Sequence, residues 1–262
     1  MYNFKMTRPS TIGEAVEALK QEDAQALGGG QTLIPTLKQR LAMPSILVSL
    51  TSILEMEGVY MSNVNEVCIG GATTHATVSR KAKAYPGLAA LAAHIGDPAV
   101  RNRGTIGGSL ANNDPSACFP AAVLASGANI ITNIRKISAD DYFQGMFTTA
   151  LEEDEVITEV RFPVPEKSHY EKFVQPASRF ALVGVMVAKY AGGVRVAVTG
   201  ASESGVFRWT AAETVLSVDF LADALDCLSL NGDGMITDVH GSGAYRAHLV
   251  KIMTGRAVKA AA

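Results

Sequence analysis

The chain has 262 residues, and 23 Lys and Arg against 25 Asp and Glu give it a formal net charge of −2. With 48% hydrophobic and 18% charged residues it has the composition of a folded chain, and it lacks the excess of cations that binding to a nucleic-acid backbone requires. Its apolar runs, such as residues 119–125, are too short to span a bilayer, and its N-terminus has no apolar signal core, so we expect a cytoplasmic protein. Cys68, Cys118 and Cys227 lie far apart and no HExxH motif occurs, which excludes a zinc ribbon and an iron–sulfur cluster held by this chain alone.

The first fifty residues predict a small α+β lobe with a glycine loop at the end of a strand. Thr11 and Glu14 have the spacing of a capping box, followed by apolar residues at helical spacing. Pro35 fits the first turn of a second helix, which follows the glycine loop 28–30. We expect helix, strand, helix and strand, in that order, over residues 12–21, 24–27, 33–41 and 45–50.

A second group of elements surrounds a long glycine-rich segment. Residues 95–117 are too polar and too rich in glycine for the interior of an element, and loops of this length usually bind a ligand or are disordered. We expect strands over 58–61, 66–70 and 129–134, helices over 77–84, 87–93 and 118–126, and further elements over 141–147 and 155–162.

The segment 163–167, with two prolines, is the best candidate for a linker. Beyond it, Gly192 and Gly193 predict a hairpin between two apolar strands. The strands are expected over 181–190 and 194–199, followed by helices over 211–217, 220–228 and 245–262.

Two glycine loops are the strongest chemical signal. The Rossmann pattern fails because position 33 is Leu, and no P-loop is present. Runs of backbone N–H groups without side chains can cradle a phosphate, and the loops at 28–30 and 104–109 both have hydroxyls beside them. Together, the two loops are suited to binding a pyrophosphate from opposite sides. Arg101 and Arg103 are interpreted as ion-paired loop residues, and the five histidines as surface or capping residues.

Three motifs together resemble a known family. They are Gly28-Gly-Gly-Gln-Thr-Leu-Ile-Pro35, Arg40-Leu-Ala-Met-Pro44 and Ile95-Gly-Asp-Pro-Ala-Val-Arg-Asn-Arg-Gly-Thr-Ile-Gly-Gly-Ser109. The resemblance is to the FAD-binding (medium) subunits of molybdenum hydroxylases, of the aerobic carbon monoxide dehydrogenase and xanthine dehydrogenase type. It continues through Tyr170-Glu-Lys-Phe173, Pro176-Ala-Ser-Arg179 and Ala244-Tyr-Arg-Ala-His-Leu249, and so covers nearly the whole chain.

The resemblance implies an α+β fold. It consists of a two-lobed vanillyl-alcohol-oxidase-type (PCMH-type) FAD-binding domain, lobes 1–57 and 58–165, followed by a smaller C-terminal α+β domain, 166–262. It also implies FAD contacts at Gly28, Gly29, Gly30, Gln31, Thr32, Leu33, Ile34, Pro35, Ile95, Thr105, Ile106, Gly107, Gly108, Ser109, Cys118, Ile157, Lys172 and Phe180. No catalytic side chain and no metal ligand are expected in this chain.

Three of these residues carry specific expectations. Lys172 is expected near the N1–C2=O edge of the flavin, where a cation stabilises the anionic reduced ring. Cys118 replaces an acidic residue of the relatives, and Phe180 replaces a tyrosine that close relatives present to the flavin. Both replacements weaken the expectation of tight FAD binding and leave the expected fold unchanged.

The implied function is electron transfer inside a larger enzyme. A large molybdenum subunit oxidises the substrate, and a small subunit with two-iron two-sulfur clusters passes electrons to FAD, which reduces a quinone, NAD or oxygen. A cytoplasmic dimer of heterotrimers is expected, most like carbon monoxide dehydrogenase. The alternatives are the FAD subunit of a xanthine, other heterocycle or aldehyde dehydrogenase, a stand-alone flavin oxidoreductase with Ser178 or Tyr170 as proton donor, and a scaffold that has lost FAD.

Overall fold

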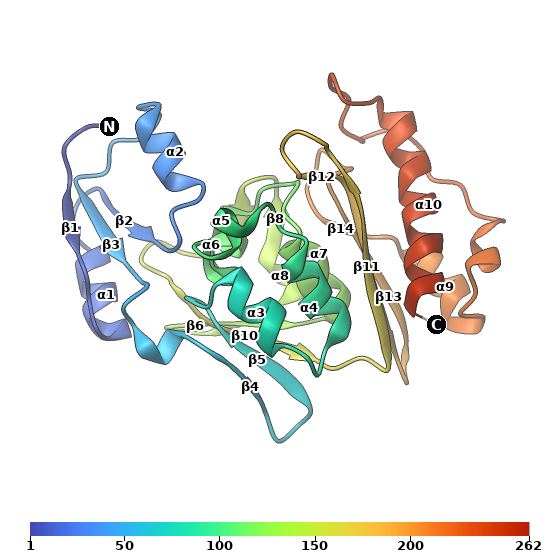
Figure 1. Cartoon of the computed structure of the whole chain (residues 1–262), viewed down its shortest axis with the longest axis horizontal. Helices are drawn as coiled ribbons and strands as arrows, with labels where there is room; N and C mark the ends of the chain where they lie inside the picture. The colour runs from blue at the N-terminus through green and yellow to red at the C-terminus, as the bar shows by residue number, and fades with distance from the viewer. Residues whose placement is uncertain (262) are drawn as a thin grey trace.

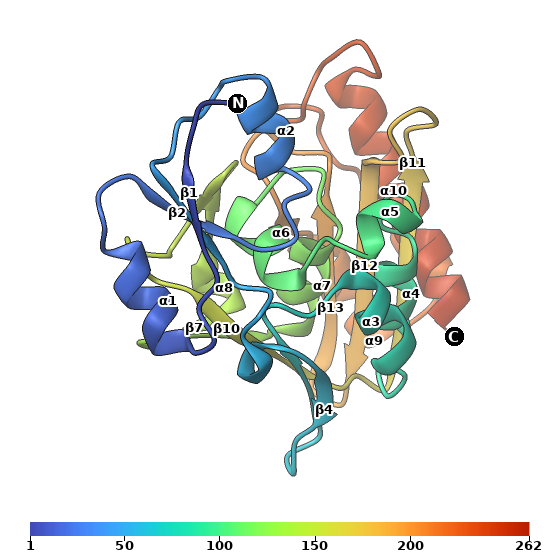
Figure 2. The ribbon, with the colours of Figure 1, turned by 60° about the vertical axis from the view of Figure 1, so that its left-hand side comes forward.

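The computed structural model describes residues 1–261, over which the strands form three main sheets and one two-stranded hairpin. The three sheets follow one another along the long axis of the molecule (Figure 1). Central helices lie between the N-terminal lobe and the C-terminal sheet, and a β-hairpin projects from the body (Figure 2).

The N-terminal lobe is a parallel three-stranded sheet in the order β1-β3-β2. Its helix α1 begins after Thr11, whose side chain accepts a hydrogen bond from the Glu14 N–H, and α2 ends before Arg40, a residue in the left-handed conformation. The four predicted elements are present in the predicted type and order: α1 (Ile12–Leu19), β2 (Ala24–Leu27), α2 (Leu33–Lys38) and β3 (Ile46–Ser49). The sequence did not predict the strand β1 (Lys5–Thr7) or the 3-10 turn η1 (Leu54–Met56).

The central lobe is an antiparallel sheet in the order β4-β5-β10-β6-β7 with helices packed on it. The prediction of a continuous loop over 95–117 is wrong, because two short helices form inside it. Asp97 caps α5 and Thr105 caps α6, each accepting a backbone N–H three residues on. The elements are β4 (Val59–Met61), β5 (Glu66–Gly70), α3 (His75–Lys81), α4 (Pro86–Ala93), α5 (Pro98–Arg101), α6 (Ile106–Asn112), α7 (Phe119–Ser126), β6 (Asn129–Thr132), β7 (Lys136–Ser138), α8 (Ala139–Tyr142), β8 (Phe143–Gly145), β9 (Thr148–Thr149) and β10 (Ile157–Pro163).

The C-terminal part is an antiparallel sheet in the order β11-β12-β13-β14, with α9 and α10 on its outer face. The helix predicted over 220–228 is wrong in type, since only the 3-10 turn η2 forms there and Leu225 is its buried residue. The last predicted residue, Ala262, lies outside the described residues. The elements are β11 (Lys167–Val174), β12 (Ala181–Tyr190), β13 (Gly193–Thr199), β14 (Phe207–Arg208), α9 (Thr210–Val218), η2 (Ala222–Leu225) and α10 (Gly243–Ala261).

Helix α7 is the centre of the largest core. All eight of its residues are buried, as expected for a helix without a polar face. Tyr170, Met186 and Ala197 of the C-terminal sheet belong to the same core cluster as α7. The predicted boundary after residue 165 lies between β10 and β11, yet the core continues across it, and the domain limits stay a prediction. Among residues 1–261, no helix is long and apolar enough to cross a membrane.

Candidate cofactor site

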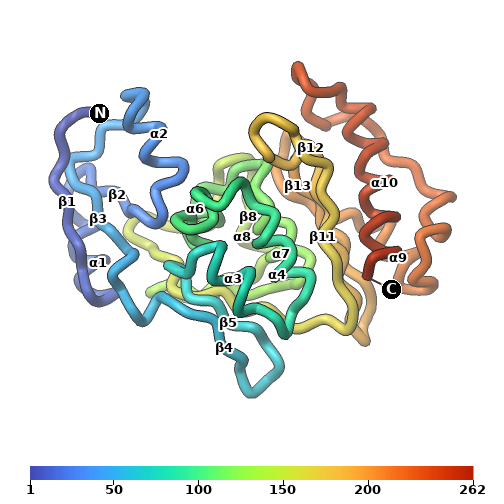
Figure 3. Tube along the Cα trace, viewed as in Figure 1, coloured from blue at the N-terminus to red at the C-terminus, as the bar shows by residue number. Residues whose placement is uncertain are grey.

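The two glycine loops touch each other. A Cβ on Gly29 would overlap the carbonyl oxygen of Arg103, and a Cβ on Gly28 would lie 2.8 Å from Thr105 Oγ1. In the Cα trace the segment before α2 accordingly runs beside the start of α6 (Figure 3). Only glycine allows the backbones to approach this closely.

The first loop presents a run of unused backbone donors. Within residues 1–261, the N–H groups of residues 28–33 donate to no protein acceptor, and the Thr32 hydroxyl makes no capping bond to α2. Gly28 and Gly30 are half-buried, and Gln31 and Thr32 are exposed. A run of free backbone N–H groups of this kind is able to bind an anion.

The second loop works differently from the expected phosphate cradle. The Gly107 N–H donates to Gly71 O at 2.9 Å, and the Gly108 N–H donates to Thr105 Oγ1 at 3.2 Å. The Ile106 N–H donates to Thr73 O. Because these donors are engaged, the surface that this loop offers is the exposed Gly108 and the half-buried Ser109.

Gly107 has a structural role. It is buried, and a Cβ there would lie 2.6 Å from the Gly71 carbonyl oxygen. Gly71 in turn packs on the carbonyl of Ile157, which is buried in the core. Ile157 therefore supports the second loop from inside, through Gly71.

His75 corrects the expectation of surface or capping histidines. It is 5% exposed, its N–H donates to Gly104 O at 2.9 Å, and its ring lies 5.2 Å from that of Phe119. Burial, with a smaller effect from Arg101, lowers the pKa of His75 to about 4, so the ring is uncharged at neutral pH.

Lys172 lies in a cavity of 470 Å³ between α5 and β11, beside half-buried Ile95. Its Nζ donates to the carbonyl oxygen of His94 at 3.1 Å. Arg101 lines the same cavity and donates to the carbonyls of Ile95 and Gly96, both at 3.0 Å. Among the described residues neither cation has a carboxylate partner, and Arg103 has none either, so the interpretation of the two arginines as ion-paired is wrong.

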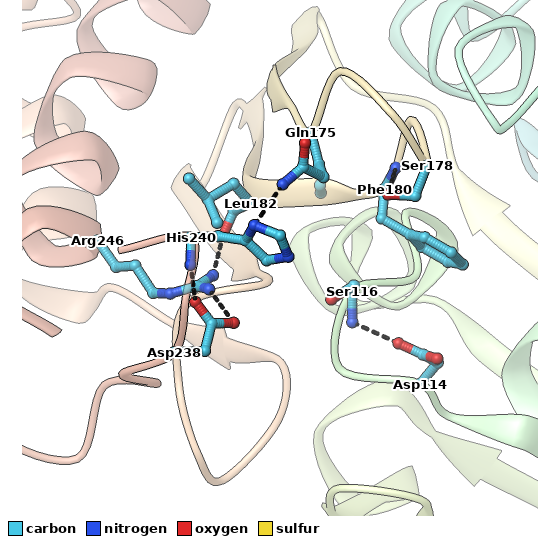
Figure 4. A pocket seen from close by; sticks show the side chains of 10 residues that line it. Asp114, Ser116, Gln175, Ser178, Phe180, Leu182, Asp238, His240 and Arg246 are labelled. Atoms are coloured by element: carbon cyan, nitrogen blue, oxygen red, sulfur yellow. Dashed lines mark hydrogen bonds and ion pairs between the residues drawn. The ribbon is translucent and has the colours of Figure 1, made fainter. Parts of the chain in front are cut away.

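Phe180 lines a second, smaller cavity of 210 Å³, shown in Figure 4. Its ring lies over Ser116 and Asp114, which follow α6, and is 53% exposed. Two contacts of the C-terminal sheet fix this segment, since Thr199 Oγ1 donates to Pro115 O at 2.7 Å and to Ala117 O at 2.8 Å. Lys172 and Phe180 thus lie in separate cavities, on either side of the turn between β11 and β12.

Cys118 is buried in the core beside the hydroxyl of Tyr170. Burial raises the pKa of that hydroxyl well above its usual value. Cys118 is 4% exposed and the Tyr170 side chain 2%.

Sequence reasoning missed the strand end that carries the second loop. Gly71, Thr73 and His75 all bond to or pack on residues 104–107. The available signal was the pair Gly70-Gly71 directly after a predicted strand, which indicates close backbone approach.

The fold and the two glycine loops in contact define an α+β protein with a candidate anion site, and the comparisons identify its family. Residues 2–165 match the family described as the FAD binding domain in molybdopterin dehydrogenase. The chain is 34% identical to the nicotine 6-hydroxylase medium subunit of Paenarthrobacter nicotinovorans, covering 97% of this chain and 96% of that one. It is 32% identical to the carbon monoxide dehydrogenase medium chain of Afipia carboxidovorans, covering 99% and 96%.

Solved structures agree with this result. The chain matches CO dehydrogenase from Oligotropha carboxidovorans with a TM-score of 0.90 at 31% identity, covering 99% of this chain and 98% of that one. It matches quinoline 2-oxidoreductase from Pseudomonas putida 86 with a TM-score of 0.88 at 30% identity, covering 99% and 97%. The chain belongs to the family of FAD-binding subunits of molybdenum hydroxylases, which confirms the predicted fold class, cofactor and oxidoreductase role.

Proposed function

We propose that this chain holds the FAD diphosphate on the free N–H groups of residues 28–33, with Gly108 and Ser109 of the second loop facing them. This run of six unused donors, closed by the contact of Gly29 with Arg103, carries the proposal. Neutral donors suffice for a diphosphate in such a nest. Bound FAD would take up electrons from an iron–sulfur donor and deliver them to an external acceptor.

The cavity beside Lys172 is the proposed place of the flavin ring. It is the larger of the two, and Lys172 and Arg101 donate there to backbone carbonyls, while Glu171 lines the same cavity and Asp97 lies within reach of the Arg101 charge. Cations at this position favour the anionic reduced ring over the neutral oxidised one. Phe180 would then contact the cofactor from the other side of the β11–β12 turn.

The assembly is proposed from the relatives. Several are named as medium chains or medium subunits, which supports a large molybdenum subunit and a small iron–sulfur subunit as partners here. A cytoplasmic dimer of such heterotrimers is our proposal, and carbon monoxide is the proposed substrate type from the spelling of the loop motifs. The relatives are medium subunits of enzymes named for nicotine, carbon monoxide and glyceraldehyde, which supports a substrate site on a partner subunit.

Two of the alternatives, the stand-alone flavoenzyme and the scaffold without FAD, find less support in the structure. For a stand-alone flavoenzyme, Tyr170 is an unsuitable proton donor because its hydroxyl is buried in the core, and Ser178 is exposed on the β11–β12 turn. For a scaffold without FAD, the loops would not need to keep their contact, yet the Gly28–Gly30 and Gly104–Gly108 contacts are intact.

Binding of FAD, FMN and ADP to the purified full-length chain tests the proposal. Titration followed by flavin fluorescence should show FAD binding in preference to FMN, and ADP should displace it, because the loops hold the diphosphate. Failure to bind FAD, or equal affinity for FMN, would overturn the assignment of the two loops.

A further inference from the structure

His75 lies directly beneath the junction of the two loops. The layers follow one another in contact: Gly29 lies on the backbone of Arg103 and Gly104, Gly104 lies on the His75 ring, and the ring lies against Phe119 of α7. A Cβ on Gly104 would lie 2.6 Å from His75 Nε2 and 3.1 Å from Val100 O, so the loop has no space to move toward the ring.

The His75 ring supports the second loop through its shape and its lack of charge, and makes no side-chain hydrogen bond to it. Its Nδ1 is fully buried and has no partner among the described residues. The surroundings disfavour a proton: Arg101 is the charged group whose field reaches the ring, α6 and α7 carry no charged residue, and Arg80 and Lys81 lie in the last turn of its own helix. Asp97, which caps α5, is the nearby carboxylate; it interacts with Arg101, and among residues 1–261 no carboxylate forms an ion pair with His75.

We propose that His75 is the positioning residue of the second glycine loop, and that its uncharged ring holds the two loops together so that protonation opens the junction and releases the cofactor. This inference rests on the proposed FAD site and adds to it a residue outside both loops and a dependence on pH. Because Gly29 and Gly104 are in contact, a displacement of residues 103–105 is passed directly to the first loop.

The sign of the pH effect follows from linkage. In the closed junction the pKa of His75 is about 4, and in an open one it returns toward its ordinary value of 6.5. As the pH falls from 8.0 to 5.5, the open form gains a proton that the closed form excludes, so the ratio of open to closed junctions should rise roughly tenfold, which is also the largest loss of FAD affinity that this group can cause.

The test compares the full-length wild-type chain with His75→Leu and His248→Leu. Leucine has a similar volume and never takes a proton, and since Nδ1 has no partner it removes no hydrogen bond. His248 is an exposed histidine on α10 and serves as the matched control. FAD dissociation constants are measured by fluorescence at pH 8.0 and 5.5.

We expect wild type and His248→Leu to lose FAD affinity on acidification by up to about tenfold, and His75→Leu to lose much less relative to its own affinity at pH 8.0. Backbone amide exchange over residues 103–109 in the FAD-free chain gives a second readout. Relative to the intrinsic rate, it should quicken at pH 5.5 in wild type and in His248→Leu, and should not quicken in His75→Leu. An equal pH dependence in His75→Leu and wild type, or tighter FAD binding at acid pH, would overturn the inference. Absence of FAD binding by wild type at pH 8.0 would instead contradict the proposed function.

Discussion

Gly29 is a position at which the candidate site requires glycine. Its position against Arg103 O admits no Cβ, although its own backbone conformation suits any residue. The requirement for glycine therefore comes from the contact between the two loops. A side chain at position 29 would disturb this contact before it disturbed the fold on either side of it.

Gly29→Ala should lower the flavin content of the purified chain while the chain still folds, because the methyl group forces the two loops apart at a cost of about 1–3 kcal/mol, a roughly five- to hundredfold loss of FAD affinity. Gly192→Ala is the control, since a Cβ at Gly192 meets nothing within 4 Å. Flavin-to-protein absorbance ratios and circular dichroism measure both effects. Wild-type flavin content in Gly29→Ala would show that the loops bind no cofactor together.

Lys172 provides the residue-scale test of the flavin end. Lys172→Ala should keep FAD but lower the flavin midpoint potential by roughly 30 mV, the shift that about 1.4 kcal/mol of lost charge stabilisation gives for two electrons. Reduction by the iron–sulfur donor should slow accordingly, and Lys172→Arg should restore much of the potential. Lys167, exposed on the same strand, supplies the control Lys167→Ala. If Lys172→Ala and Lys167→Ala have the same potential, Lys172 does not contact the flavin.

At the scale of elements, caps and ion pairs fix the segments around the site. Glu155 joins two of these segments: its carboxylate accepts from Thr132 Oγ1 at 2.7 Å and from Arg135 Nε at 2.9 Å. The hydrogen bonds from Arg135 lower the pKa of Glu155 to about 2, against an ordinary value of 4.5. They tie the β6–β7 turn to the segment before β10.

The lowered pKa of Glu155 predicts that the free energy of unfolding falls at acid pH. Its pKa is lowered in the folded state, so its stabilisation is complete above about pH 4.5 and is lost as the pH falls toward 2, with about 2 kcal/mol lost between pH 7 and pH 3. Urea unfolding at several pH values should show this loss in wild type and a smaller one in Glu155→Gln, which starts less stable at pH 7. Glu152→Gln, which removes the exposed partner of Arg135, should behave like wild type. The same pH slope in all three proteins would rule out the Glu155 effect.

The elements that the sequence predicts well are those with a strong local pattern. Periodicity and caps locate α1, α7 and the hairpin of β12 and β13 to within a few residues. Residues 95–117 are predicted as a loop because glycine and polar residues mask two short helices, although Asp97 followed by Pro98 and Thr105 three residues before Gly108 are start signals for a helix. The burial of His75 carries no local signal, because it arises from Gly104 and Phe119, which are distant in sequence.

In the candidate site, too, the features with a local sequence signal are predictable and those set by distant residues are not. The two loops are predictable as candidate binding segments from their glycines, and they lie in contact with each other in the fold. That one ligand is held by both loops stays a prediction. The difference between them, free donors in the first and engaged donors in the second, is set by Gly71 and Thr73 at the end of β5 and has no signature within either loop.

At the scale of the whole molecule, the C-terminal sheet is part of the site's support. It shares a core with α7, and through Thr199 it holds the segment between α6 and α7 that lines the smaller cavity. A chain cut after residue 165 would leave that face of α7 exposed. The family assignment adds partners to this picture, so the chain is expected to carry its electrons only within an assembly.

The visible absorption spectrum of the tagged chain, purified gently from its native cells, tests the central claim most directly. We predict flavin bands superposed on iron–sulfur absorption, together with a co-purifying large subunit that contains molybdenum and identifies the substrate. A colourless protein, or flavin absorption from the chain without partners, would contradict the account of an FAD-carrying electron-transfer subunit.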